Sequence, residues 1–177
     1  MKNIFKTLAL SAFAALLSPP LTASAEETQH QKHFESTLKQ TGNYVLFERM
    51  SPKSCKIDIT LTYPNGKTQS MNASCSTLYA LGRANGAREF VFYSKNRIIT
   101  LIAPPGGRVK ESGTFWTVTG ALMTEGKDTT NWKTPGSCLM KTPENRETGS
   151  MTCVTNDKKV RLTMMIPQIT HTTNLLN

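Results

Sequence analysis

Two cysteines bracket the stretch that limits this fold most strongly, SCKIDITLTYPNGKTQSMNASC, residues 54–75. Its centre, Pro64-Asn65-Gly66, suits a three-residue hairpin loop, because proline presets the first position and glycine accepts the left-handed third position. Such a loop places Tyr63 opposite Lys67, and the same register sets the two cysteines opposite each other. The stretch therefore predicts a β-hairpin closed by a disulfide. A two-residue Asn65-Gly66 loop is the alternative, and it would offset the cysteines by one position.

The same register divides the hairpin into two faces. One face is apolar, and it carries Ile57, Ile59, Met71 and Ala73. The other face is wholly polar, and it carries Asp58, Thr60, Thr62, Thr68, Ser70 and Asn72. A hairpin with one buried and one solvated face requires this division.

The chain contains four cysteines, which allow three pairings. The hairpin register pairs Cys55 with Cys75, and elimination then pairs Cys138 with Cys153. Neither cysteine of the hairpin lies in a C-x-x-C motif, so zinc-ribbon and thioredoxin-type chemistry lack their spacing. Each disulfide would contribute roughly 3 kcal/mol by restricting the unfolded chain.

The N-terminus has the features of a secretory signal peptide, predicted over residues 1–25. Lys2 and Lys6 precede an apolar run over 8–17, and Ala23-Ser24-Ala25 supplies small residues for cleavage. The run is shorter than the roughly 20 residues that span a bilayer. We therefore expect an exported protein, periplasmic or secreted, that does not span the membrane.

The remaining chain has the length of one domain. We expect an N-terminal helix or linker over 26–43, a disulfide-stapled β-domain over 44–167 and a flexible tail over 168–177. Apolar residues mostly alternate along the β-domain, and turn residues separate the candidate strands. These strands are Tyr44–Arg49, Lys56–Tyr63, Lys67–Ala73, Glu89–Ser94, Arg97–Ala103, Thr114–Met123, Ser137–Lys141, Ser150–Thr155 and Lys159–Ile166, with turns that include Thr134-Pro135-Gly136.

Two segments favour helices. In the segment 27–39, a stripe at helical spacing comprises His30, His33, Phe34, Thr37 and Leu38. In the segment STLYALGRANGAR, Ser76 could cap a short helix that ends at Gly82 or Gly86. The fold class expected is therefore mostly β: a single antiparallel sheet or meander, or a small barrel-sandwich, with one or two short helices and two disulfides.

The sequence shows no set of residues that indicates catalysis. The histidines are His30, His33 and His171, all near the ends of the chain, whereas a catalytic base must be held rigidly. The eight methionines form no Met-x-x-Met cluster, so copper binding is a weaker hypothesis than core packing. We expect no enzyme activity, no metal and no cofactor.

Charge suggests a binding function. Without Lys2 and Lys6 the chain keeps 19 of its 21 basic residues against 12 acidic ones, a net charge of +7. Such a chain is attracted to anionic surfaces. Candidate binding residues are the basic ones at strand ends and a neighbouring tryptophan: Lys95, Arg97, Arg108, Lys110, Trp116, Lys158, Lys159 and Arg161.

The function predicted is that of an exported, non-enzymatic binding or accessory protein. It would act in the bacterial cell envelope or as a host-facing factor, and engage an anionic envelope component or an acidic protein, not nucleic acid. One alternative is an inhibitor of a secreted enzyme that uses the KESGTFW loop at 110–116. Another is a periplasmic hydrolase whose carboxylate pair the sequence does not reveal.

Overall fold

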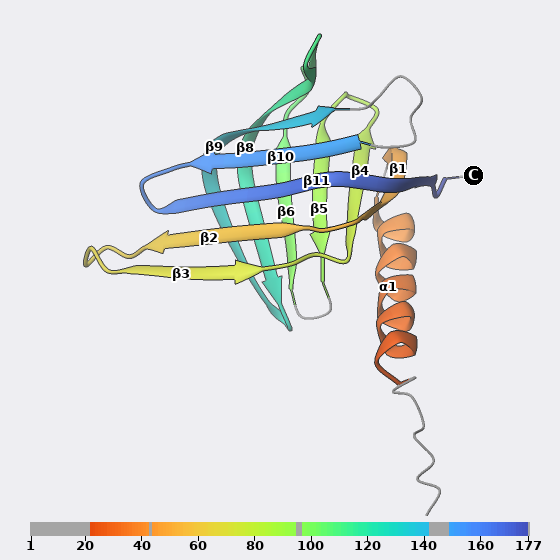
Figure 1. Ribbon diagram of the computed structural model, residues 1–177, viewed down its shortest axis with the longest axis horizontal. Coiled ribbons are helices and arrows are strands. Elements are labelled where there is room, and N and C mark those ends of the chain that lie inside the picture. The colour runs from red at the N-terminus through yellow and green to blue at the C-terminus, as the bar shows by residue number, and fades with distance from the viewer. Residues whose placement is uncertain (1–21, 43, 95–96, 142–148, 177) are drawn as a thin grey trace, which may run out of the picture.

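The computed structural model describes residues 22–42, 44–94, 97–141 and 149–176 (Figure 1). The chain is mostly β, with one helix and one antiparallel sheet within this part. The elements are α1 (Thr22–Thr41), β1 (Tyr44–Pro52), β2 (Lys56–Thr62), β3 (Thr68–Ala73), β4 (Thr77–Arg83), β5 (Arg88–Tyr93), β6 (Ile98–Ala103), β7 (Arg108–Lys110), β8 (Gly113–Glu125), β9 (Asp128–Lys141), β10 (Gly149–Asn156) and β11 (Val160–Asn174).

The strand order is β1-β4-β5-β6-β8-β9-β10-β11-β2-β3, and β1 also pairs with β11. This second pairing closes the sheet into a ring, from which the β2–β3 hairpin extends. Both β1 and β2 lie along the same edge of β11: β1 pairs with its residues 169–174, and β2 pairs with its residues 160–165. The long strand β11 therefore joins the ring to the hairpin.

The sheet folds into two layers that cross at a steep angle (Figure 1). The strands β10, β11, β2 and β3, together with the C-terminal end of β9 that pairs with β10, form one layer, which we call the front layer, and β4, β5, β6 and β8 form the other. The main core lies between the two layers and contains both disulfides. Its largest fully buried side chains include Ile57, Ile59, Phe90, Phe92 and Leu101.

The hairpin predicted from the cysteine-flanked stretch is confirmed. Residues of β2 and β3 pair in the expected register, with Ile57 opposite Ala73 and Thr62 opposite Thr68. The loop has three residues, because the Tyr63 N–H donates to the Lys67 carbonyl (2.9 Å) and Gly66 has a positive φ of 78°. Cys55 and Cys75 form a disulfide across this register.

The second disulfide is also confirmed. Cys138 of β9 and Cys153 of β10 lie directly opposite each other and are bonded. Their side chains are 0% and 1% exposed, compared with 7% and 8% for Cys55 and Cys75. The β9–β10 disulfide therefore lies in the centre of the core, and the hairpin disulfide lies at its margin.

Helix α1 covers the side of β1, β4 and β5 that faces away from the main core, where a second apolar cluster lies. Phe34 and Leu38 of the helix pack on Phe47, Tyr79 and their neighbours in this cluster. The predicted stripe was correct for these two helix residues. It was wrong for His30, His33 and Thr37, which are exposed. The helix face that packs on the sheet includes Gln31 and Glu35 instead.

The second predicted helix is wrong. The segment TLYALGR forms strand β4, whose residues Thr77 to Gly82 are all buried. Leu78 and Ala80 point into the main core, and Tyr79 and Leu81 point to the cluster under α1. A strand that is covered on both faces has no polar–apolar alternation, so its pattern resembles that of a buried helix.

Three other boundaries differ from the expectation. Thr134-Pro135-Gly136 is no turn between strands; it lies within β9, where the β8–β9 register shifts between Val118 and Gly120. Strand β11 continues to Asn174, into the segment predicted as a flexible tail, because β1 pairs with it and Ile169 is buried. The short strand β7 was not foreseen.

The predicted cleavage point after Ala25 lies inside α1, which begins at Thr22. Cleavage at this point stays a prediction. Within the described ranges, no helix combines the length and the hydropathy that crossing a bilayer requires. The two disulfides fit an oxidising compartment.

Candidate functional site

An exposed, mostly polar surface lies on the side of the front layer that faces away from the core. We call it the outer face. Because side chains alternate along a strand, the buried residues of β10, β11 and β2 assign the residues between them to this face. Hydroxyl side chains are the most frequent on it, and the exposed Val154 and Met165 also lie there. The hydroxyl residues are Thr60, Thr62, Thr68, Ser70, Ser137, Ser150, Thr152 and Thr163.

Three cavities lie along the outer face. A cavity of about 490 Å³ at the β10–β11 turn is lined by Thr60, Thr62, Asn156, Asp157, Lys158 and Arg161. A second, of about 270 Å³, lies over β9 and β10 and is lined by Ser137, Leu139, Lys141, Ser150, Thr152 and Val154. A third, of about 510 Å³, shares Lys141 and Ser150 with the second and reaches Lys53. The second and third are therefore neighbours, and all three lie along the outer face.

Cations lie at both ends of the outer face. Lys158 and Arg161 mark the end at the β10–β11 turn, and Lys53 and Lys141 mark the other. On β10, Asn156 lies beside Arg161 and Ser150 lies beside Lys141. These β10 residues are six positions apart, so the two ends are about 20 Å apart along the strand. Lys56, opposite Met165, lies between the two ends.

The outer-face cations have no carboxylate partner within the described chain. The ion pairs among the described residues involve other cations: they join Arg49 to Glu35, Arg83 to Glu89 and Arg97 to Glu125. In contrast, no carboxylate of the described residues forms an ion pair with the exposed cations of the outer face, which are Lys53, Lys56, Lys141, Lys158 and Arg161.

Two carboxylates lie on or beside the same surface, and both make local hydrogen bonds. Asp157 Oδ1 accepts the Lys159 backbone N–H (2.8 Å), and Asp58 Oδ1 accepts the side-chain amide of Asn72 (3.1 Å). Against the five cations they leave a net formal charge of +3 on the outer face. The surface therefore favours anions.

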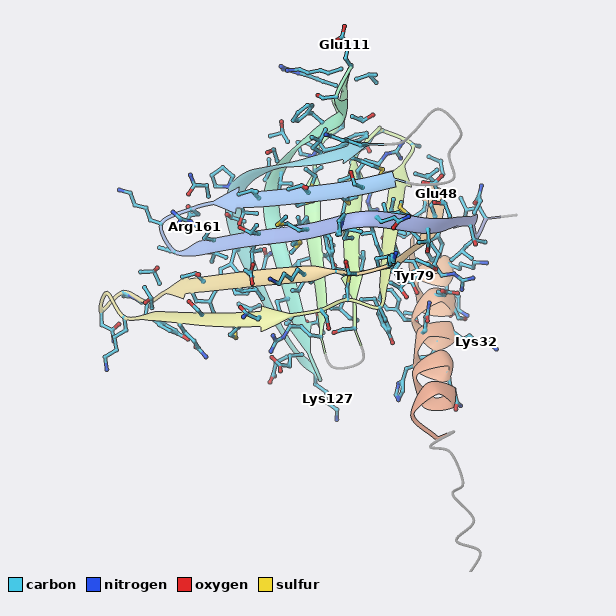
Figure 2. The ribbon with its side chains drawn as sticks, in the orientation of Figure 1. Lys32, Glu48, Tyr79, Glu111, Lys127 and Arg161 are labelled. Atoms are coloured by element: carbon cyan, nitrogen blue, oxygen red, sulfur yellow. A yellow bond between two sulfur atoms is a disulfide. The ribbon has the colours of Figure 1, made fainter. Side chains whose placement is uncertain are left out.

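The predicted binding residues divide into separate groups. Lys158 and Arg161 lie together at the β10–β11 end of the outer face, and Lys159 is exposed in the same turn but does not line the cavity. Arg108 and Lys110 lie on β7, beside the protruding tip that carries Glu111 (Figure 2). Figure 2 also shows that Arg161, Glu111 and Lys127 mark three different ends of the molecule. The strand ends therefore do not converge into one basic rim.

The other predicted residues have contacts of their own. Arg97 Nη2 donates to both carboxylate oxygens of Glu125 (2.9 and 3.0 Å), so the Arg97 guanidinium already has an anionic partner. Trp116 is half-buried: the Arg88 guanidinium lies 5.4 Å from its ring, and Phe90 packs against it edge-on. Lys110 lies 5.2 Å from the Phe115 ring. Lys95 lies outside the described residues.

Three cations of the outer face, Lys53, Lys56 and Lys141, were not among the predicted binding residues. The alternation of polar and apolar residues shows which side chains of each hairpin face the solvent, and for residues 55–75 these side chains were assigned correctly. Nothing in the sequence indicated that β11 pairs with β2, and this pairing places the β10–β11 and β2–β3 hairpins side by side. This pairing joins residues about a hundred positions apart, so no local pattern indicates it.

A second polar cluster lies under α1 and was also missed. Glu35 Oε1 accepts hydrogen bonds from Tyr79 Oη (2.9 Å), Arg49 Nη1 (3.1 Å) and Gln31 Nε2 (3.4 Å). Burial, and then the nearby Glu35 carboxylate, raise the pKa of Tyr79 well above its ordinary value. This cluster fastens the helix to the sheet, and its groups face inward.

Within the described residues, no three His, Cys, Asp or Glu side chains gather in a way that could hold a metal ion. No protein-family model, curated protein or solved structure matches the chain.

Proposed function

We propose that this chain is an exported, non-enzymatic binding protein of the cell envelope or the cell exterior that engages an anionic surface or polymer through its outer face. The observation that carries the proposal is the combination of three cavities on one exposed sheet face with cations that have no carboxylate partner among the described residues. The hydroxyl rows add hydrogen-bonding groups between these cations.

The form of the outer face suits an extended ligand with repeated negative charges. The cations lie at two ends about 20 Å apart, with Lys56 between them, so one compact anion would not reach them all. The flat rows of threonine and serine match the hydroxyl groups of a glycan or a polyol phosphate. Recognition would depend on charge, and therefore weaken with added salt.

The experiment compares two triple variants with the same change in net charge. In the face variant, Lys56→Glu, Lys141→Glu and Arg161→Glu reverse outer-face cations. In the matched control, Lys32→Glu, Lys127→Glu and Lys133→Glu reverse exposed cations on α1, at the β8–β9 tip and on β9. The probes are vesicles rich in phosphatidylglycerol and immobilised heparin.

At roughly 0.5–1 kcal/mol for each exposed charge contact, three lost contacts weaken binding by about 10- to 100-fold. We expect this loss in the face variant, and a much smaller loss in the control. If both variants weaken binding equally, only net charge matters and the outer face is not a site. If the unchanged protein binds neither probe at low salt, the proposal fails.

The β7–β8 tip favours a second candidate, inhibition of a secreted enzyme. This tip protrudes from the sheet (Figure 1), and its Val109 is 84% exposed, with Arg108 and Lys110 on either side. A projecting hairpin with an exposed apolar residue is suited to insertion into a cleft. Phe115 and Trp116 of the predicted loop instead lie on β8, so Val109 would be the inserted residue. The face variant would then keep full affinity for the enzyme.

A further inference from the structure

Strand β3 forms a free edge of the front layer. It is the last strand in the sheet order, and among the described residues β2 is the one strand that pairs with it. Four of its six residues are exposed, and Met71 and Ala73 are partly buried. An edge of this kind presents unpaired backbone groups to the solvent.

The hydrogen-bond pattern shows which backbone groups are unpaired. The Tyr63–Lys67 pair is hydrogen-bonded through its backbone, and antiparallel pairs alternate between bonded and non-bonded. The bonded residues of β3 are therefore Gln69, Met71 and Ala73, which point toward β2. The N–H and C=O groups of Thr68, Ser70 and Asn72 point away from the sheet.

This edge lacks the usual protection against strand pairing. Proteins commonly block edge strands with charged side chains, proline or a bulge. The sequence of β3, TQSMNA, contains no charged residue and no proline, and its register with β2 is regular throughout. The disulfide between Cys55 and Cys75 also holds the end of the hairpin in place. The edge is therefore a preformed template for another strand.

We propose that the free edge of β3 binds an extended, acidic peptide segment of a partner protein as an additional antiparallel strand. Main-chain hydrogen bonds would join it to Thr68, Ser70 and Asn72, as in other cases of strand addition. Its alternate side chains would continue the outer face on one side and contact Met71 on the other.

Charge and area argue against a second copy of the chain as the occupant. The chain carries a formal net charge of +9, or +7 without the predicted signal peptide, so two copies repel each other, whereas an acidic segment is attracted. An added six-residue strand also buries much less than the roughly 800 Å² per partner of a stable interface. The complex is therefore a transient one with a single extended segment.

The experiment uses Ser70→Pro, with Ser70→Thr as its matched control. Proline removes the outward N–H of Ser70 and leaves the bonds to β2 intact, and edge strands tolerate such a residue. Threonine keeps this N–H and changes only the side chain. The probe is a fluorescent octapeptide with alternating Val and Glu, together with the same peptide N-methylated at alternate residues.

We expect the unchanged protein and Ser70→Thr to bind the octapeptide, and Ser70→Pro to bind at least tenfold more weakly. The N-methylated peptide should not bind. In amide hydrogen exchange, saturation with the octapeptide should protect Thr68, Ser70 and Asn72, which exchange rapidly in the free protein.

The proposal is overturned if Ser70→Pro binds as well as Ser70→Thr, or if no binding occurs. It is also overturned if the unchanged protein sediments as a dimer that Ser70→Pro makes monomeric, since the occupant is then a second copy. Ser70→Pro also removes one hydroxyl of the outer face, so its binding of heparin and anionic vesicles is compared with that of Ser70→Ala. Alanine lacks the same hydroxyl and keeps the N–H, so the two variants should bind these probes equally. Failure of strand addition is thereby distinguished from failure of the proposed outer-face function.

Discussion

The contact between Tyr79 and Glu35 allows a quantitative test of how α1 is held. Tyr79 is 0% exposed, and its hydroxyl donates to a carboxylate whose side chain is 13% exposed. A hydrogen bond to a charged group contributes about 1.5–3 kcal/mol. Because Glu35 keeps Arg49 and Gln31 as donors, we expect Tyr79→Phe to lower the free energy of unfolding by about 1–2 kcal/mol.

Tyr44→Phe is the matched control. The Tyr44 hydroxyl also donates to a glutamate, Glu89 (3.2 Å), but Tyr44 is only partly buried and Arg83 binds the same carboxylate through two nitrogens. The loss in this variant should stay below about 0.5–1 kcal/mol. Both losses can be measured by urea unfolding of the disulfide-intact proteins, followed by circular dichroism.

The pH dependence gives a second measurement. The pKa of Tyr79 is raised in the folded state, first by burial and then by Glu35, from an ordinary value of 10.0. The folded protein therefore keeps a proton that the unfolded chain loses. The stabilisation is fully present below about pH 10 and is lost above it, by about 1.4 kcal/mol for each pH unit.

Tyr79→Phe should remove this contribution, so that its stability falls less steeply than that of the unchanged protein above about pH 10. Two results would refute the reasoning. One is a Tyr79→Phe loss no larger than that of Tyr44→Phe. The other is an equal decline of both proteins with alkaline pH.

Two further predictions concern the disulfides and a glycine. Replacing Cys55 and Cys75 by alanine should lower the free energy of unfolding by about 3 kcal/mol, and replacing Cys138 and Cys153 should cost more, because their fully buried sulfurs also leave a cavity. Urea unfolding checks this order, and the reverse order would contradict it. Gly113→Ala should cost at least about 3 kcal/mol and Gly126→Ala about 1 kcal/mol: both glycines have positive φ, but only at Gly113 would the added carbon meet the Met140 carbonyl. Similar losses in the two variants would show that backbone conformation alone decides the cost.

The candidate site illustrates the limit of prediction from this sequence. Arg161 and Lys158 were predicted as binding residues, and they lie on the outer face. Arg97 was also predicted as a binding residue, but it forms an ion pair with Glu125. Lys141 and Lys53 were not among the predicted binding residues, because their importance depends on the cavity that they share. A charge is readable from sequence, but the presence or absence of a carboxylate partner is decided by packing.

The sequence by itself determined the local features of this protein. Pro64-Asn65-Gly66 and the alternation around it specified the β2–β3 register and the Cys55–Cys75 disulfide, because a turn and its adjacent strands interact over a few residues. The mostly β character follows from the same kind of signal.

Only the tertiary structure decided which elements meet. Strand β4 resembled a helix because α1 covers one of its faces and the core covers the other. The outer face exists because β11 pairs with β10 on one side and with β1 and β2 on the other, which brings together segments far apart in the chain. The free edge of β3 follows from the same topology. Such pairings depend on how buried surfaces fit over the whole fold, and no short stretch of sequence contains that information.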